Sequence, residues 1–329
     1  MVDNKEILDI KGTIRTLADY VMLNSVATDS TSLYYGRAGM SICLFEASRY
    51  LNDEYIEDYA FTLLKQSLVN EKRDIRFDAG LSGIGYALAY LIRNEFVDAD
   101  FYELFQIQHN IIVDEFVRQD YENMDLKDLM QQWQLIPYFH YIPCDNASYK
   151  IKELHKKCID KFKTEWEAIR GDTNYIDKEL IATLWKLYLK VLPFADGLKT
   201  YQYVYEYLNL VKDGLIKRDI TSLHYISIID GFSLEEMVES CISDFYPIDS
   251  LFLKNLFLEP YISQDGIRTR ILKKFIGVLV GDLEKKITGQ LGYSSNSATL
   301  SYGVSGFILG LIGMETLSKR ISNEIISII

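Results

Sequence analysis

The chain has 329 residues, of which 48% are hydrophobic and 25% charged, and its formal net charge is −12. These fractions are typical of a folded globular protein, whereas the negative charge argues against a general nucleic-acid binder, which needs a cationic face. No uninterrupted apolar run reaches the length of a membrane-spanning helix, so we expect no membrane insertion.

Helical periodicity dominates the first hundred residues. Apolar positions at 42–47 predict a helix that breaks at 52–54, and a second pattern at 56–68 follows with the i, i+3, i+4 spacing of an amphipathic helix. The next unit repeats this plan. Residues 84–92 are almost wholly apolar, as in a helix buried on most sides, and 98–100 offers a cap for the helix that follows. One buried and one amphipathic helix per unit predict two layers.

The rest of the chain keeps helical patterns. Segments 179–191 and 200–212 predict helices, with a turn at 193–197 between them. Residues 135–149 form the least regular stretch, which we expect to be an ordered excursion. Few prolines and few alternating patterns favour an all-α fold, and the absence of a linker predicts one domain over 1–329.

Three short segments share the pattern Gly-x-(Ala/Ser)-Gly-apolar: GRAGM at 36–40, GLSGI at 80–84 and GVSGF at 303–307. With 19 glycines in the chain, chance produces roughly one Gly-x-x-Gly. The first two lie 44 residues apart and the last two 223 apart, or five steps of about 44.6, which fits a repeat array of seven slots. The repeated glycines are Gly36, Gly39, Gly80, Gly83, Gly303 and Gly306.

Glycine suits these positions because it permits a tight turn or a close backbone approach where a helix begins. A small residue one turn later lets a neighbouring helix pack closely. The alternative is that any protein of helical hairpins has glycine at some helix crossings.

The flanks of the motifs resemble one family. SLYYGRAG at 32–39 and GLSGIGYAL at 80–88 are similar to the first two repeats of lanthionine synthetase C-like proteins, and LSYGVSG at 300–306 is similar to a later repeat. The resemblance implies an α/α toroid of about seven helical hairpins. In it, the glycine motifs open the inner helices and a cleft lies at one end. Members of the family cyclise peptides by adding a cysteine thiolate to a dehydrated Ser or Thr.

That chemistry depends on zinc, which is held by two cysteines and a histidine, two of them adjacent in a Cys-His-Gly motif, and which activates the substrate thiol. No cysteine of this chain is directly followed by a histidine. In the C-terminal half, the only cysteine is Cys241 and the only histidine is His224. We therefore expect no metal site, no zinc cofactor and no zinc-dependent thioether chemistry.

Two close His/Cys pairs, His140 with Cys144 and His155 with Cys158, would supply four metal ligands if each pair lay on one helix face. Pro143 interrupts the first pair, and lysines surround the second. Cys43 lies in an apolar run and is interpreted as a small core residue.

The motifs also suggest ligand-binding residues. Arg37, inside the first motif, has a guanidinium suited to a carboxylate or phosphate, or is simply an exposed turn residue. Tyr34, Tyr35, Tyr86 and Tyr302 flank the motifs and would line one mouth of the toroid. Aromatic linings suit extended ligands such as peptides or sugars; alternatively these rings fill the ends of the helical layers.

Two carboxylates, Asp78 and Asp230, lie at predicted helix starts. Facing a common cleft, they would serve as general acid and base, as in glycoside hydrolysis. Helix capping is the simpler explanation for both.

Three functional hypotheses follow. The first is a zinc-less member of the family that binds or modifies a precursor peptide, beside other enzymes of peptide modification. The second is a carbohydrate-active α/α barrel, and the third is a non-catalytic scaffold. Four cysteines without a disulfide spacing, and a start that lacks a basic segment followed by an apolar core, predict a cytoplasmic location.

Overall fold

The computed structural model describes residues 10–69, 73–169, 298–300, 303–316 and 321. Every element assigned within these residues is an α-helix, which confirms the all-α class for this part of the chain. None of the helices found there is both long and apolar enough to cross a bilayer. The helices predicted at 179–191 and 200–212, and the turn between them, lie outside the described residues.

The order of the helices matches the predicted units. The apolar patterns predict two pairs of helices, and the structure has them as α2 with α3 and α4 with α5. Helix α15 begins directly after Gly303. The helices are α1 (Ile10–Ser25), α2 (Arg37–Leu51), α3 (Glu54–Leu68), α4 (Leu81–Arg93), α5 (Phe101–Arg118), α6 (Leu126–Trp133), α7 (Ile136–Tyr141), α8 (Asp145–Ile169) and α15 (Val304–Thr316).

The breaks between paired helices are built as caps. Asn52 ends α2 in the left-handed region, at φ 56°, and the Asp53 carboxylate accepts hydrogen bonds from two backbone N–H groups in the first turn of α3. Asp100 caps α5 in the same way. Both breaks predicted from the sequence are therefore confirmed.

The stretch at 135–149 is more regular than expected, since it contains α7 and the start of α8. Pro137 lies in the first turn of α7, where a missing backbone N–H costs no intrahelical bond. Pro143 lies between the two helices. The prolines thus mark helix starts and ends instead of preventing helices.

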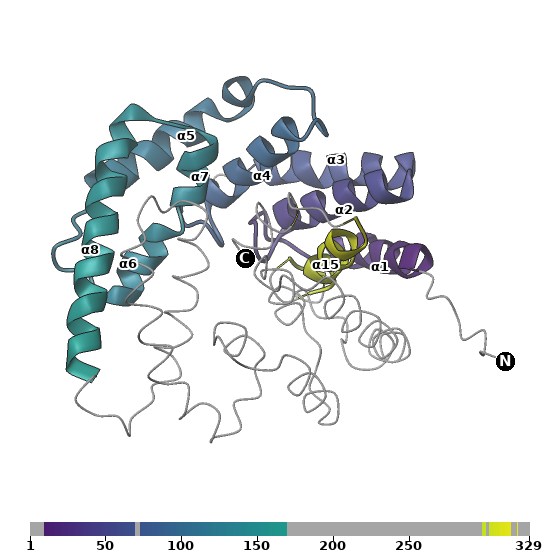
Figure 1. Cartoon of the computed structure of the whole chain (residues 1–329). Helices are drawn as coiled ribbons and strands as arrows, with labels where there is room; N and C mark the ends of the chain where they lie inside the picture. Colours follow the sequence, from purple (N-terminus) through teal and green to yellow (C-terminus); the bar gives the residue numbers. More distant parts are fainter. Residues whose placement is uncertain (1–9, 70–72, 170–297, 301–302, 317–320, 322–329) are drawn as a thin grey trace, which may run out of the picture.

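The described helices form two layers. Helices α15, α2, α4 and α7 contact one another in that order, while α3 packs against α2, and α5 against α4. Eleven consecutive residues are buried in α2 (Ala38 to Ser48) and in α4 (Leu81 to Leu91), whereas α3 buries one face only. Figure 1 shows α15 beside α1 and α2, although it is far from both in sequence.

The first two glycine motifs are entered by the same turn. The backbone N–H of Arg37 donates to the carbonyl of Ser30 (3.0 Å), and that of Leu81 donates to the carbonyl of Asp74 (2.7 Å). In each case the acceptor lies seven residues before the donor. The turn therefore recurs with the 44-residue period of the sequence.

The third motif repeats the turn of the second. The Ser82 hydroxyl donates to the carbonyl of Ile75 (2.6 Å), and the Ser305 hydroxyl donates to the carbonyl of Ala298 (2.5 Å), again seven residues back. Because the same hydrogen bond recurs in both, the second and third motifs share this local structure, while the units predicted between them at 170–297 lie outside the described residues.

The second glycine of each of the first two motifs lies where no side chain fits. A Cβ on Gly39 would be 2.0 Å from the carbonyl oxygen of Leu33, and a Cβ on Gly83 would be 2.0 Å from that of Phe77. On the other side, Leu33 packs on Gly83 and Leu300 packs on Gly39, so that each leucine Cβ lies 2.8 Å from where a Cβ on the glycine would be. The C-terminal motif thus contacts the first motif as the first contacts the second.

A further contact recurs at the opposite end of the inner helices. The Arg49 guanidinium lies 3.5 Å from the centre of the Phe96 ring, and that of Arg93, 44 residues later, lies 4.9 Å from the centre of the Tyr141 ring. Each arginine near the end of an inner helix stacks on an aromatic ring of the following unit. The unit that contains α7 therefore continues the repeat, although no glycine motif opens it.

A buried histidine joins α5 to α7. His109 is 7% exposed, and its Nδ1 lies 2.7 Å from the Tyr138 hydroxyl. Desolvation lowers the pKa of His109 below its ordinary value of 6.5. The folded protein therefore holds this imidazole in its neutral form at pH values where the unfolded chain already binds a proton.

This burial predicts an acid-sensitive fold. As the pH falls below about 6.5, His109 binds a proton in the unfolded chain but not in the folded chain. The free energy of unfolding therefore decreases, and it levels off below the pKa of His109 in the folded state. Denaturant titrations between about pH 7.5 and 5.5 should show a smaller decrease for His109→Gln than for wild type. His140→Gln, at an exposed position, is the matched control. An unchanged pH dependence in His109→Gln would contradict the assignment.

Candidate functional site

The loops that open α2 and α4 lie against each other. The backbone N–H of Tyr34 donates to the carbonyl oxygen of Asp78 at 3.0 Å. We call residues 30–37 and 74–82 the loop cluster. It brings together the predicted residues Tyr34, Tyr35, Arg37 and Asp78, at the end of the molecule where the described glycine motifs begin their helices.

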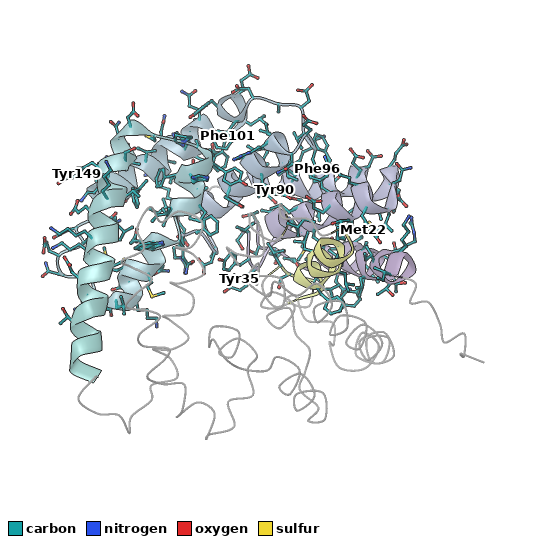
Figure 2. All side chains as sticks on the ribbon, viewed as in Figure 1. Met22, Tyr35, Tyr90, Phe96, Phe101 and Tyr149 are labelled. Atoms are coloured by element: carbon teal, nitrogen blue, oxygen red, sulfur yellow. The ribbon has the colours of Figure 1, made fainter. Side chains whose placement is uncertain are left out.

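The aromatic residues of the cluster begin a continuous row of ring contacts that extends into α4 and α7. Tyr35 contacts Tyr34, which contacts Phe77; Phe77 contacts Tyr86, and Tyr86 contacts Tyr141, with centroids 4.9–6.1 Å apart. Tyr34 is 5% exposed and Tyr86 is 1% exposed, so both pack the base of the cluster instead of lining an open surface. The two ends of the row, Tyr35 and Tyr141, are partly exposed, and Tyr35 is the one that lies in the cluster. Figure 2 shows Tyr35 away from Tyr90 and Phe96.

A charged pair lies beside these rings. The Arg76 guanidinium donates to Asp74 through Nε (2.9 Å) and Nη2 (2.7 Å). These hydrogen bonds to Asp74 raise the pKa of Arg76, and the charges of Asp78 and Tyr35 act in the same direction. Neither Asp74 nor Arg76 is among the residues predicted from the sequence, although an Asp-x-Arg spacing just before a glycine motif is the signal that would have indicated the pair.

Asp78 does not cap α4, so the capping interpretation is wrong for this residue. The N-cap of α4 is Gly80, which makes no side-chain cap bond. The Oδ1 atom of Asp78 is buried, and no hydrogen-bond partner for it is found. A buried carboxylate oxygen is normally satisfied by a donor, so Asp78 is an exception that calls for an explanation.

Arg37 shows the same feature with the opposite charge. Its Nε is buried and also lacks a hydrogen-bond partner. Among the described residues, neither Arg37 nor Asp78 forms an ion pair. The loop cluster therefore holds a cation and an anion that are both partly buried and both have an unsatisfied atom.

Two predicted site residues, Tyr302 and Asp230, lie outside the described residues. The hypothetical pairing of Asp78 with Asp230 thus stays a prediction. Gly303 is buried directly before α15, the position that Gly36 and Gly80 occupy before α2 and α4.

The part of the chain that the structure describes has no group of three or more His, Cys, Asp or Glu side chains able to hold a metal ion. His140 and Cys144 do not share a helix, since α7 ends between them. Cys43 and Cys158 are buried, and burial raises the pKa of both thiols, which disfavours the thiolate. The interpretation of Cys43 as a core residue is confirmed. Cys241 and His224 lie outside the described residues.

Comparison with known proteins finds no match to a family model or to a curated protein. The resemblance to lanthionine synthetase C-like proteins therefore depends on the motif flanks. The loop cluster and the contacts between the repeats are the features from which a function can be inferred.

Proposed function

We propose that the chain is a ring-shaped, zinc-less relative of the lanthionine synthetase C-like proteins that captures a precursor peptide at the loop cluster. One observation supports the ring above others: Leu300 packs on Gly39 as Leu33 packs on Gly83. If each unit contacts the next in this way, the last unit precedes the first and the array closes. The inner helices of such a ring would all begin at one mouth, which the loop cluster borders.

The residues of the cluster suit a peptide. A partly exposed tyrosine offers aromatic surface, a guanidinium binds carboxylates, and a carboxylate accepts from amines. A chain with a net charge of −12 also attracts basic partners over long range. Binding needs no metal, so it is compatible with the loss of the family's zinc ligands. Modification of the captured peptide would then depend on other enzymes of the pathway, in the cytoplasm, where thiols stay reduced.

The test is capture of a precursor peptide encoded beside this protein. Arg37→Ala should weaken binding about tenfold, the effect of losing one charge-assisted contact worth about 1.4 kcal/mol. Arg118→Ala on α5, with a side chain 70% exposed, is the control and should bind as wild type does. Tyr302→Ala is expected to act like Arg37→Ala. Equal binding by Arg37→Ala and wild type, or no binding by any of them, would refute the proposal.

A carbohydrate-active α/α barrel is the second candidate, and the unsatisfied carboxylate of Asp78 favours it. It requires a second carboxylate, because Asp74 is engaged with Arg76. Hydrolysis of oligosaccharides that disappears in Asp78→Asn would support this candidate over peptide capture. A protein that binds neither class of ligand would fit a scaffold.

A further inference from the structure

We infer that Asp78 and Arg37 together form a two-point recognition site for a ligand with one cationic and one anionic group. Within the peptide of the proposed function, on which this inference rests, these groups are a lysine or arginine side chain or the amino terminus, and a carboxylate. The two side chains carry opposite charges, lie in adjacent turns, and each has a buried atom without a partner.

Neither side chain has a local structural role that would explain its position. The backbone carbonyl of Asp78 binds Tyr34 and the backbone N–H of Arg37 binds Ser30, so the turns are held by main-chain bonds. The N-cap residues of α4 and α2 are Gly80 and Gly36, so neither Asp78 nor Arg37 is the N-cap of its helix. The bonds that hold these turns therefore come from the main chain and not from the two charged groups.

Neighbouring charges do not satisfy them either. Arg76 lies close enough to Asp78 to be influenced by its charge, yet its hydrogen bonds go to Asp74. Elsewhere in the described residues, aspartates at helix starts are used: Asp53, Asp100 and Asp125 each cap a helix. Asp78 differs from these aspartates in lacking both a cap bond and a salt bridge.

Leaving a buried polar atom without a partner costs about 1–3 kcal/mol, and more for a charged group. A ligand removes this cost if it supplies a donor to Asp78 Oδ1 and an acceptor to Arg37 Nε. An ammonium or guanidinium fits the first atom, and a carboxylate fits the second, since Nε and a terminal nitrogen of arginine bind carboxylates in a fork. Because the two residues form no ion pair with each other, a ligand that satisfies both atoms needs one cationic and one anionic group.

The experiment measures binding of four synthetic ten-residue peptides that share their length and tyrosine content. One contains lysine and glutamate, one lysine only, one glutamate only, and one neither. Wild type should bind the first at least about tenfold more tightly than each of the others, which is about 1.4 kcal/mol. In Asp78→Asn, lysine should no longer increase the affinity, whereas glutamate still should. In Arg37→Gln, glutamate should no longer increase the affinity, whereas lysine still should.

Asp114→Asn and Arg118→Gln are matched controls, because these residues carry the same charges on the exposed face of α5, 66% and 70% exposed. Thermal unfolding gives a second readout. A polar atom that is buried without a partner destabilises the fold, so neither Asp78→Asn nor Arg37→Gln should lower Tm. A structural role for either residue predicts the opposite.

Each outcome distinguishes two-point recognition from peptide capture as such. If all four peptides bind equally to wild type and to both variants, peptide capture stands and two-point recognition is wrong. If none of the four binds while the precursor peptide does, two-point recognition is wrong and peptide capture stands; if the precursor peptide does not bind either, the proposed function fails and this inference fails with it. A Tm that falls in both variants, with unchanged preferences, assigns the two residues to the fold.

Discussion

Gly83→Ala is expected to lower the free energy of unfolding by more than about 4 kcal/mol, an exceptional cost for one methyl group. In most helix interiors this change stabilises by about 0.5–1 kcal/mol, because glycine loses more backbone freedom on folding. Here the new Cβ would lie 2.0 Å from the carbonyl oxygen of Phe77 and 2.8 Å from the Cβ of Leu33. The first of these atoms is backbone, so the turn itself would have to open. Chemical denaturation followed by circular dichroism measures the loss.

Gly85→Ala, two residues further along α4, is the matched control. Its Cβ would meet the ring edges of Phe105 and Tyr138, each at 2.7 Å. Rings can shift where a backbone turn cannot, so we expect a cost of about 1–3 kcal/mol, typical of an overpacked core. Equal stability of the two variants would show that the turn before α4 tolerates a side chain and is not built as described.

The fold was predictable from the sequence wherever local chemistry decides it. Asp53 and Asp100 cap their helices with the bonds that aspartate makes to free N–H groups. The almost wholly apolar sequence of α4 predicts burial on most sides, and residues 81–91 are buried. The prediction of an irregular stretch near Pro137 was wrong, also for a local reason. A proline in the first turn of a helix is tolerated, and composition alone does not say which turn it occupies.

The site was less predictable than the fold. The loop cluster follows from the equivalence of the motifs, but the burial of Tyr34 and Tyr86 does not, since a tyrosine beside a glycine turn suits a core and a surface equally well. The sequence favours a capping role for Asp78 because it lies just before a helix. Only the three-dimensional structure shows that Gly80 occupies the N-cap and leaves the carboxylate unused. Contacts between turns far apart in sequence, not propensities, determine these roles.

Leu300→Ala is expected to destabilise the fold by about 2–5 kcal/mol, the usual cost of emptying a buried leucine site. Leu300 is 1% exposed and packs on Gly39, whereas its counterpart Leu33 is 0% exposed and packs on Gly83. Because both leucines are buried and each packs on the second glycine of a motif, Leu33→Ala should cost a similar amount. Leu23→Ala, at a position 71% exposed on α1, should change stability by less than about 0.5 kcal/mol.

Hydrogen exchange distinguishes a closed array from an open one in the same set of variants. In a closed array Leu300 supports the first unit directly, because it packs on Gly39 at the start of α2. Leu300→Ala should therefore speed amide exchange in α2, and also in α1, since α15 contacts both helices. In an open array the same variant would affect only the C-terminal motif, and exchange in α1 and α2 would match wild type. Leu33→Ala serves as the reference, since it acts between neighbouring units whether or not the ring closes. Rapid exchange in α2 for Leu33→Ala alone would therefore refute closure, while leaving the turn shared by the glycine motifs intact.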